Sequence, residues 1–394
     1  MRVHQPLTES ILTEGFMAGT LPGIGDPVGH LDRLRSIEPV AWNQVGGYWV
    51  VTGHAQVHKA STDPATFCSA RGILIEEIGR TYPSPPTMMH TDPPDHTRYR
   101  GLVQPAFRPS LMRRLEDQMR EMVVQLVEAI PTGEPVEITD ALTIPFPLWV
   151  ICELLGLDRA RWRECYEWSE ASVPGASDLT ADERLAVQTR MVTELIAATS
   201  AKRHNPGDDV LTILAEAGLS EFEVAMFAVQ LLTAGNETTR NALSGGLSAL
   251  AGNPDQWARL RSDQALIPTA AEEIVRWTAP VIYFMRTATV DCELGGVAIA
   301  AGDPVVLHYT ASSRDPQVFG ESAARFDIAR SPNPHLAFGH GAHYCIGAAL
   351  ARLEIRIVLE ELVARFAAIE PAGDVQRTSS AIIAGYRSVP LRFS

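Results

Sequence analysis

The spacing of apolar and polar positions predicts a chain built mainly of α-helices with a small β portion. Residues 110–130 repeat apolar side chains at helical spacing, opposite charged ones, which is typical of an amphipathic surface helix. The apolar face consists of Leu115, Met119, Met122, Leu126 and Ile130. Two further helices are expected, one that begins at Pro268 and runs through Arg276 and one over residues 346–366.

The longest helical pattern begins at Ser220, which has the spacing of a capping box with Glu223. It continues to about Leu250, after which Gly252 and Pro254 end it. A helix of about 30 residues is on the order of 45 Å long, which is enough to cross a whole domain. Its middle is therefore expected to be buried.

Two hairpins account for the predicted β structure. Residues 38–53 alternate in polarity and turn through Gly46–Gly47. The second hairpin is predicted over residues 294–309, with its turn at Gly302–Asp303–Pro304. The Pro-rich stretch 83–94 is predicted to be a loop, because it is too short to link two domains.

Composition narrows the class of protein. With 46% apolar and 20% charged residues, the chain has ample material for one core, and we predict a single domain over residues 1–394. The net charge of −14 repels phosphate backbones and argues against nucleic-acid binding. Five cysteines without a CxxC pair indicate a reduced, cytoplasmic protein. Residues 1–16 lack the apolar segment of a signal peptide, and the longest apolar run, Val224 to Gly235, is too short for a membrane span.

The strongest candidate for chemistry is the segment FGHGAHYCIG at residues 338–347, which directly precedes the last predicted helix. Cys345 stands just ahead of the helix N-terminus, where the positive end of the helix and free backbone amides favour a thiolate. A thiolate is the form that binds iron. Gly339, Gly341 and Gly347 permit tight turns and a close approach of the backbone to a flat cofactor.

Two other interpretations of this segment are open from its residues alone. A single cysteine is more often a small buried apolar residue than a ligand. His340, His343 and Cys345 could also supply three ligands to zinc, although the fourth ligand has no evident source in the sequence.

The full pattern F-x-x-G-x-H-x-C-x-G resembles the cysteine-loop signature of the cytochrome P450 family at every fixed position. The likeness extends in order from about residue 90 to the C-terminus. It implies a triangular helical fold with haem b between the long central helix and the helix after the cysteine, and Cys345 as the axial iron ligand. The loop residues implied to contact the haem are Phe338, Gly339 and Gly347.

The long predicted helix carries the segment AGNETT at residues 234–239, which resembles the oxygen-activating segment of the same family. The resemblance implies that Gly235, beside Ala234, leaves room for dioxygen. It also implies that Thr238 stabilises bound dioxygen and a water chain, while Glu237 relays protons. Taken without the resemblance, an acid followed by two threonines in a helix is usually a satisfied structural network.

Two further sets of residues follow from the resemblance. Glu273 and Arg276, three apart on one helix face, match the family's E-x-x-R pair, and Arg330 resembles the third member of that structural network. The haem propionates require cationic or hydrogen-bonding partners. The residues implied for this role are His96, Arg100, Arg286 and His343.

The substrate is expected to be lipophilic, because the segments predicted to line the pocket are apolar. These residues are Leu74, Ile75, Leu231, Val281, Ile282, Ile382 and Ile383. Sterols, branched lipids, terpenoids and macrolide-type natural products are all compatible with this composition.

Electrons are expected from a separate ferredoxin and its reductase, since no flavin or iron–sulfur segment follows the haem-binding region. A group of arginines could attract an acidic partner, or could equally be ordinary solvated side chains. This group is Arg108, Arg113, Arg114, Arg352 and Arg356.

The resemblance thus favours a monooxygenase that inserts one atom of O2 into a lipophilic molecule. A related haem-thiolate enzyme that ends in oxidative coupling, desaturation or ring formation is the main alternative. A non-catalytic haem protein that binds a gas or a lipid, and a helical binding domain without metal, are the alternatives from other classes.

Overall fold

The computed structural model describes residues 27–44, 46–80, 87–173, 177–378 and 380–394. The predicted absence of a signal peptide concerns residues 1–16, which lie outside these ranges, as do residues 83–86 of the predicted Pro-rich loop.

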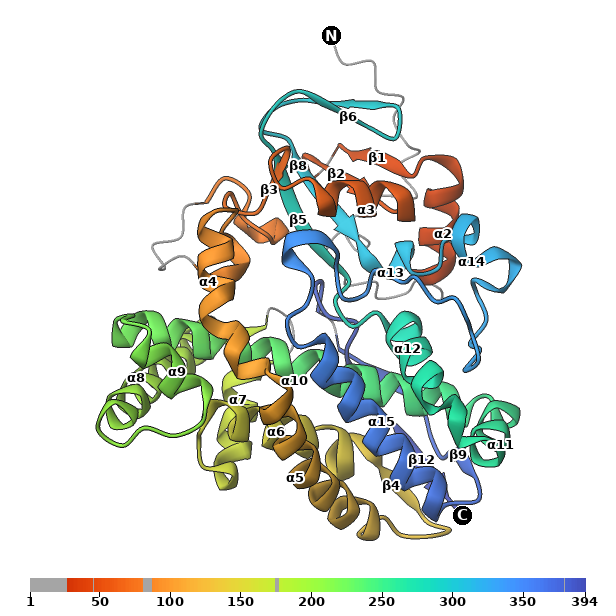
Figure 1. Cartoon of the computed structure of the whole chain (residues 1–394). Helices are drawn as coiled ribbons and strands as arrows, with labels where there is room; N and C mark the ends of the chain where they lie inside the picture. Colours follow the sequence, from red (N-terminus) through yellow and green to blue (C-terminus); the bar gives the residue numbers. More distant parts are fainter. Residues whose placement is uncertain (1–26, 45, 81–86, 174–176, 379) are drawn as a thin grey trace.

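Helices form most of the described structure, as the apolar spacing predicts, and they gather around α10 (Glu221–Ala251). Figure 1 shows α10 crossing the helical part of the molecule behind α15. The other α-helices are α2 (Pro27–Ile37), α3 (His54–Thr62), α4 (Asp95–Val103), α5 (Pro109–Glu128), α6 (Pro145–Leu155), α7 (Trp162–Ser172), α8 (Ala181–His204), α9 (Val210–Glu216), α11 (Pro254–Ser262), α12 (Ile267–Thr278), α13 (Tyr309–Ser312), α14 (Pro316–Phe319) and α15 (Ala348–Arg365).

The capping box at the start of α10 is formed as predicted. The Glu223 amide donates to Ser220 Oγ at 3.2 Å, and the Ser220 amide donates to Glu223 Oε2 at 2.9 Å. With 31 residues α10 is about 46 Å long, and most of its middle is buried against α6, α7, α8, α12 and α15. The predicted bounds of α5, α12 and α15 agree with the structure to within about two residues.

A five-stranded sheet lies beside the helices, in the upper part of Figure 1, with strand order β1-β2-β8-β5-β3. The first predicted hairpin is confirmed, because β1 and β2 pair antiparallel with Trp42 opposite Trp49. β8 runs parallel to β2 and antiparallel to β5. The bounds of these strands are β1 (Val40–Asn43), β2 (Tyr48–Val51), β3 (Phe67–Cys68), β5 (Tyr283–Ala288) and β8 (Pro304–His308).

The second predicted hairpin, over residues 294–309, is wrong. The hairpin at this place joins β6 (Cys292–Leu294) to β7 (Val297–Ile299) through Gly295–Gly296, and both glycines have positive φ, at 61° and 82°. Positive φ at both central residues is what a two-residue turn of this twist requires. The chain does turn near Gly302, but β8 then pairs with β2 and β5, where its apolar side chains are buried.

Three short strands complete a small sheet of order β4-β12-β9, and two more form a separate pair. Their bounds are β4 (Pro135–Glu137), β9 (Ile369–Pro371), β10 (Gln376–Arg377), β11 (Tyr386–Ser388) and β12 (Pro390–Phe393).

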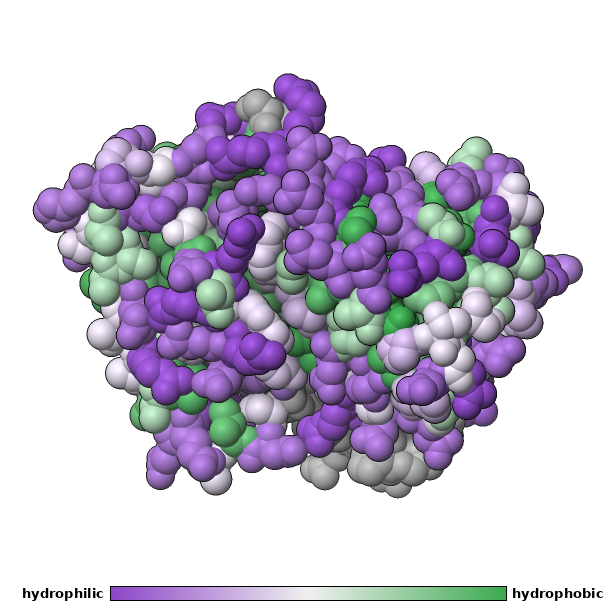
Figure 2. All heavy atoms as spheres, turned by 90° about the horizontal axis from the view of Figure 1, so that it is seen from below, coloured by the Kyte–Doolittle hydropathy of each residue, from purple (hydrophilic) through white to green (hydrophobic). Residues whose placement is uncertain are grey.

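The apolar faces of the helices meet in one large core that extends from α4 to β12. Seen from below, hydrophilic residues cover most of the surface, with apolar residues between them (Figure 2). Among the helices of the described residues, none is both long enough and apolar enough to cross a membrane.

Candidate active site

One cavity brings the cysteine segment and the middle of α10 together. Ala234, Gly235 and Thr238 of α10 line it, and so does Cys345, which stands three residues before the first residue of α15. Thus two segments more than a hundred residues apart in sequence line the same space. The remainder of the wall is largely apolar.

The cysteine loop is held by its own backbone. The Cys345 amide donates to the Phe338 carbonyl at 2.9 Å, and the Ala348 amide donates to the Cys345 carbonyl at 3.3 Å. Burial raises the pKa of the Cys345 thiol, whereas a hydrogen bond from the Gly347 amide acts to lower it. A metal cation at the sulfur would add to the lowering effect of the amide and favour the thiolate.

The three glycines of the loop have different roles. Gly339 and Gly347 line the cavity, and Gly339 has a positive φ of 68°. Gly341 serves packing instead, because a Cβ there would lie 2.3 Å from the Ser61 carbonyl oxygen of α3. A side chain at position 341 would push the loop away from α3.

Thr238 and Glu237 point to different sides of α10. Thr238 lines the cavity and its hydroxyl donates to the Ala234 carbonyl at 2.7 Å. Glu237 is 1% exposed and is absent from the cavity wall; its carboxylate accepts from Arg240 at 2.9 Å and from Ser169 at 3.3 Å. The acid expected to relay protons is therefore held in a buried ion pair behind the helix.

Gly235 faces α6 as well as the cavity. A Cβ at this position would lie 2.9 Å from Ile151 Cδ1. Ile151 itself lines the cavity, so the space beside Gly235 is shared with that side chain.

Basic and imidazole side chains gather at one part of the cavity wall. Arg100, Arg286, His96 and His343 all line it, and the rings of the two histidines lie 4.2 Å apart. Burial lowers the pKa of His96 and, helped by the Arg286 charge, lowers that of His343 to about 3. Neither arginine forms an ion pair with a described residue, and buried His96 Nε2 has no hydrogen-bond partner in the protein.

His343 Nε2 lies 3.1 Å from Ser69 Oγ and Arg286 donates to the Met285 carbonyl at 2.8 Å, but neither arginine has an anionic partner among the described residues. Donors of this kind fit the carboxylates of a haem. The Cys345 thiol, which lines the same cavity, fits its iron.

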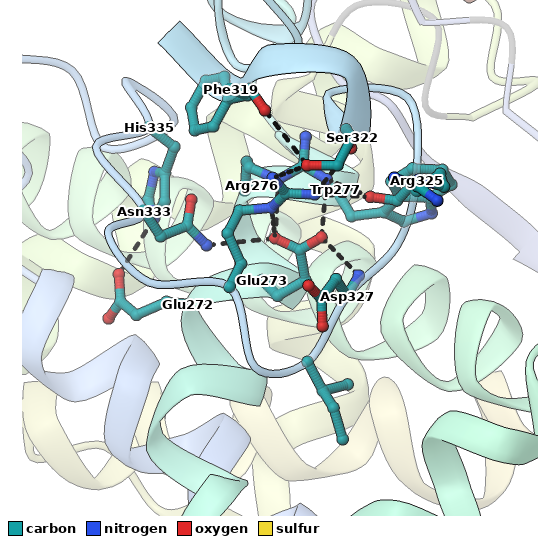
Figure 3. Close-up of polar contacts among 12 residues, drawn as sticks. Glu272, Glu273, Arg276, Trp277, Phe319, Ser322, Arg325, Asp327, Asn333 and His335 are labelled. Carbon is teal, nitrogen blue, oxygen red and sulfur yellow. Dashed lines mark hydrogen bonds and ion pairs between the residues drawn. The ribbon is translucent and has the colours of Figure 1, made fainter.

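A buried ion-pair network supports the loop from behind (Figure 3). Glu273 and Arg276 of α12 are both 0% exposed, and the guanidinium donates to both carboxylate oxygens at 2.7 Å. Arg330 Nε donates to the same carboxylate at 3.0 Å, as do the Asp327 amide at 2.8 Å and Asn333 Nδ2 at 3.2 Å. The network therefore ties α12 to the segment that leads into the cysteine loop.

Only part of the predicted substrate pocket lines the cavity. Leu231 and Val281 do so. The other predicted residues pack instead in a neighbouring apolar cluster; they are Leu74, Ile75, Ile282, Ile382 and Ile383. Sequence reasoning missed several residues that do line the cavity, among them Ile73, Met88, Met89, Phe107, Ile151 and Leu154.

The five arginines proposed to meet a partner are partly neutralised. Arg108 and Arg114 both pair with Asp208, at 2.6 and 3.0 Å. Arg352 pairs with Glu272, and Arg356 lies 3.9 Å from Glu360. Arg113 is exposed and makes no ion pair with the part of the chain that the structure describes.

The structure does not support the alternative of a zinc site. In the described ranges, groups of three His, Cys, Asp or Glu side chains arranged to hold a metal ion are absent. A cavity in a helical fold, lined by a single cysteine, a hydroxyl-bearing helix and basic side chains, instead has the composition of a site for a flat, anionic iron cofactor.

Comparison with known proteins agrees with this layout. A family model described as Cytochrome P450 matches residues 186–384. Linalool 8-monooxygenase from Pseudomonas putida is 37% identical over 379 residues, which cover 91% of this chain and 93% of that protein. A steroid C26-monooxygenase from Mycolicibacterium smegmatis is 35% identical, with 94% of this chain and 92% of that protein covered.

A solved structure is similar over nearly the whole chain. The crystal structure of CYP108D1 from Novosphingobium aromaticivorans superposes with a TM-score of 0.86 at 30% identity, covering 97% of this chain and 99% of that one. The chain belongs to the cytochrome P450 family. It is a cytochrome P450 monooxygenase with a haem-iron cofactor.

Proposed function

We propose that the protein binds haem b through Cys345 and inserts one oxygen atom of O2 into a lipophilic molecule of the terpenoid, branched-lipid, sterol or macrolide type. The observation that carries this proposal is that Cys345 and Thr238 line one and the same cavity. The relatives named for linalool, methyl-branched lipid and steroid oxidation support the substrate range. We also propose that residues 1–394 form a single domain that works in the cytoplasm.

The side chains that would hold the cofactor follow from the site. Arg100, Arg286, His96 and His343 would hold the propionates, and Cys345 would bind the iron, with the Gly347 amide hydrogen-bonded to its sulfur. When bound, haem supplies the activation of dioxygen with electrons delivered one at a time.

The protein's own part is to manage protons and exclude water. The Thr238 hydroxyl can turn from the Ala234 carbonyl, to which it now donates, toward the cavity. Glu237 must rotate away from Arg240 before its carboxyl can reach the Thr238 side of the helix. The apolar remainder of the wall, including Ile151 and Leu231, holds a lipophilic substrate and keeps bulk water out.

We propose a separate ferredoxin, served by its reductase, as the electron donor. Arg113 is the best candidate for contact with an acidic partner, because it is exposed and unpaired within the described ranges. Arg352 is a weaker candidate, because it pairs with Glu272 and lies 4.5 Å from the Phe338 ring centroid.

The first test is the carbon monoxide difference spectrum of the dithionite-reduced protein. A strongly red-shifted Soret band that is lost in Cys345→His but kept in Cys292→Ser is expected, since Cys292 lies in the β6–β7 hairpin away from the cavity. No haem band in protein supplied with haem would overturn the proposal. A panel of linalool, a methyl-branched fatty acid, a sterol and a macrolide, read by the spectral shift on binding, then narrows the substrate class.

Thr238→Ala separates an enzyme from a non-catalytic haem protein. An enzyme should release more peroxide for each electron pair consumed, because the hydroxyl that steers protons is gone. A protein that merely binds a gas or a lipid would keep its ligand and show no turnover to lose.

A further inference from the structure

A second cavity, of about 340 Å³, lies behind α10. Arg240 lines it, whereas Thr238 and Thr239 line the first cavity, so the two spaces touch opposite faces of the same helix. Unlike the first, its walls are mainly polar. They include Tyr166, Glu170, Asp178, Arg240, Tyr386 and Arg387.

The second cavity reaches the surface at Asp178 and Arg387. These side chains are 86% and 46% exposed, and they pair with each other at 3.2 Å. A polar space of this size has room for on the order of ten water molecules. Solvent can therefore approach the back of α10 from this side.

A shared guanidinium joins two carboxyl groups at the inner end of the cavity. Arg240 donates to Glu170 Oε1 at 3.0 Å and to Glu237 Oε2 at 2.9 Å. The side chains of Arg240 and Glu237 are 3% and 2% exposed, whereas that of Glu170 is 15% exposed. One cation thus faces two acids in a nearly dry place, and a single proton shared by the acids would balance the charge.

The surroundings favour that proton. Burial, followed by the neighbouring charge of Glu237, raises the pKa of Glu170 to about 7, against the lowering effect of Arg240. Tyr166, which lies on α7 like Glu170, is close to Glu170, Arg240 and Glu237. The charged and titratable groups across the cavity are Asp178, Tyr386 and Arg387.

Unpaired polar atoms around the network indicate water positions. Arg240 Nε, Asn236 Oδ1 and Thr378 Oγ1 are buried and have no hydrogen-bond partner among the residues that the structure describes. Buried polar atoms in proteins are nearly always hydrogen-bonded, if not to protein then to ordered water. Water from the second cavity is the available partner for Arg240 and Thr378, both of which line it.

We propose that Glu170 takes protons from solvent in the second cavity and passes them to Glu237, which supplies the oxygen site beside Thr238. The inference rests on the proposed function. Glu237 is 1% exposed and has no contact with bulk solvent of its own, so Glu170 is its route to water. Glu170 is a positioning residue in this scheme, since it acts through Glu237.

The transfer balances as two proton steps. Protonated Glu170 passes its proton along its side-chain hydrogen bond to the Glu237 carboxylate, and the ionised Glu170 that remains takes up a proton from bulk hydronium, relayed through water in the cavity. Arg240 contacts both carboxyl groups and keeps one anion paired at every stage. Once neutral, Glu237 no longer forms an ion pair with Arg240, and this frees its side chain to rotate toward Thr238.

The first measurement is infrared difference spectroscopy of the haem-loaded protein between about pH 6 and about pH 8. A protonated-carboxyl band that titrates near neutral pH is expected in the native protein and in Asp178→Asn, and its loss is expected in Glu170→Gln. In Glu237→Gln the pH midpoint of this band should fall, because the negative charge that raises the pKa of Glu170 is removed. In D₂O the band should shift within the mixing time, since solvent reaches Glu170. A band that persists in Glu170→Gln, or one that does not exchange, would overturn the proposal.

The second measurement is oxidation of linalool, as the probe, with a plant-type ferredoxin and reductase. Glu170→Gln is expected to slow oxidation roughly tenfold and enlarge the solvent isotope effect, whereas Glu170→Asp and Asp178→Asn should stay close to native. Unchanged rates and isotope effects in Glu170→Gln would refute the proton route while leaving the oxygenase assignment intact. Loss of the thiolate carbon monoxide band in the native protein would refute the proposed function itself. If linalool is not oxidised, the panel compound with the largest binding shift replaces it.

Discussion

Replacing Glu273 with Gln is expected to destabilise the protein strongly. The carboxylate accepts five hydrogen bonds, three of them from the guanidinium groups of Arg276 and Arg330. Gln has nearly the same shape, but its amide nitrogen would present hydrogens to donors that already point at it. Both guanidinium groups would then be buried without an anion.

The size of the effect follows from burial. Removing one partner of a fully buried ion pair costs about 3–5 kcal/mol, because an uncompensated charge is left behind. Glu273 and Arg276 are 0% exposed, so water cannot replace the lost carboxylate without opening the network. Three backbone carbonyls, of Ser313, Ala323 and Arg325, still accept from Arg276 and hold the cost within this range.

Urea unfolding, followed by circular dichroism, measures the change. Urea is preferable to guanidinium chloride, because a salt would screen the charges in question. Glu116→Gln is the matched control: Glu116 also pairs with a helical arginine, Arg120 at 2.8 Å, but is 33% exposed. That change should cost at most about 0.5 kcal/mol. If the loss in Glu273→Gln lies within about 1 kcal/mol of the loss in the control, the buried network contributes little to the free energy of unfolding.

Three other outcomes are expected. Gly246→Ala should lower the free energy of unfolding by about 1–3 kcal/mol, since the new Cβ would lie 2.7 Å from Ile274 Cγ2. Gly101→Ala is the control: its Cβ would meet open space, and it should stabilise α4 by up to about 1 kcal/mol. Burial raises the pKa of Glu170 from 4.5 to about 7, so between these pH values the folded state holds a proton that the unfolded state has lost. The free energy of unfolding should therefore fall as pH rises from about 4.5 to about 7, by up to roughly 3 kcal/mol. In Glu170→Gln this dependence on pH should be weaker. His96→Leu should leave unfolding of the haem-free protein nearly unchanged, since His96 Nε2 has no protein partner, but should speed the transfer of haem to apomyoglobin.

The positions of the helices along the chain could be predicted from the sequence, because the patterns that mark each helix involve residues close together in sequence. The capping box at Ser220 and the apolar stripe of α5 depend on residues three or four apart, and the structure reproduces both. The cysteine segment likewise carries its own backbone geometry in its glycines. Strand pairing is different, since β8 finds its partners in β2 and β5 rather than in the strand just before it.

The walls of the site were harder to predict for the same reason. Leu231 lines the cavity because it lies on the same face of α10 as Ala234 and Thr238, a spacing visible in sequence. Ile151 and Leu154 belong to α6, which is apolar almost all round, so no period marks the side that faces the cavity. Glu237 pairs with Arg240 three residues further along the same helix, a spacing visible in the sequence, whereas the second partner of Arg240, Glu170 of α7, lies 70 residues away and no local pattern reveals it.

The parallel pairing of β2 with β8 has a consequence for how the chain is made. Trp49 of β2 lies opposite Val305 of β8, which a ribosome adds 256 residues later (305 minus 49). β4 similarly pairs with β12, which lies near the end of the described chain and is synthesised much later. We therefore expect the early hairpin to leave the ribosome with an unpaired edge, the kind of surface that chaperones shield. Pairings so distant along the chain close late and slowly, because each must first overcome the entropy of a long loop.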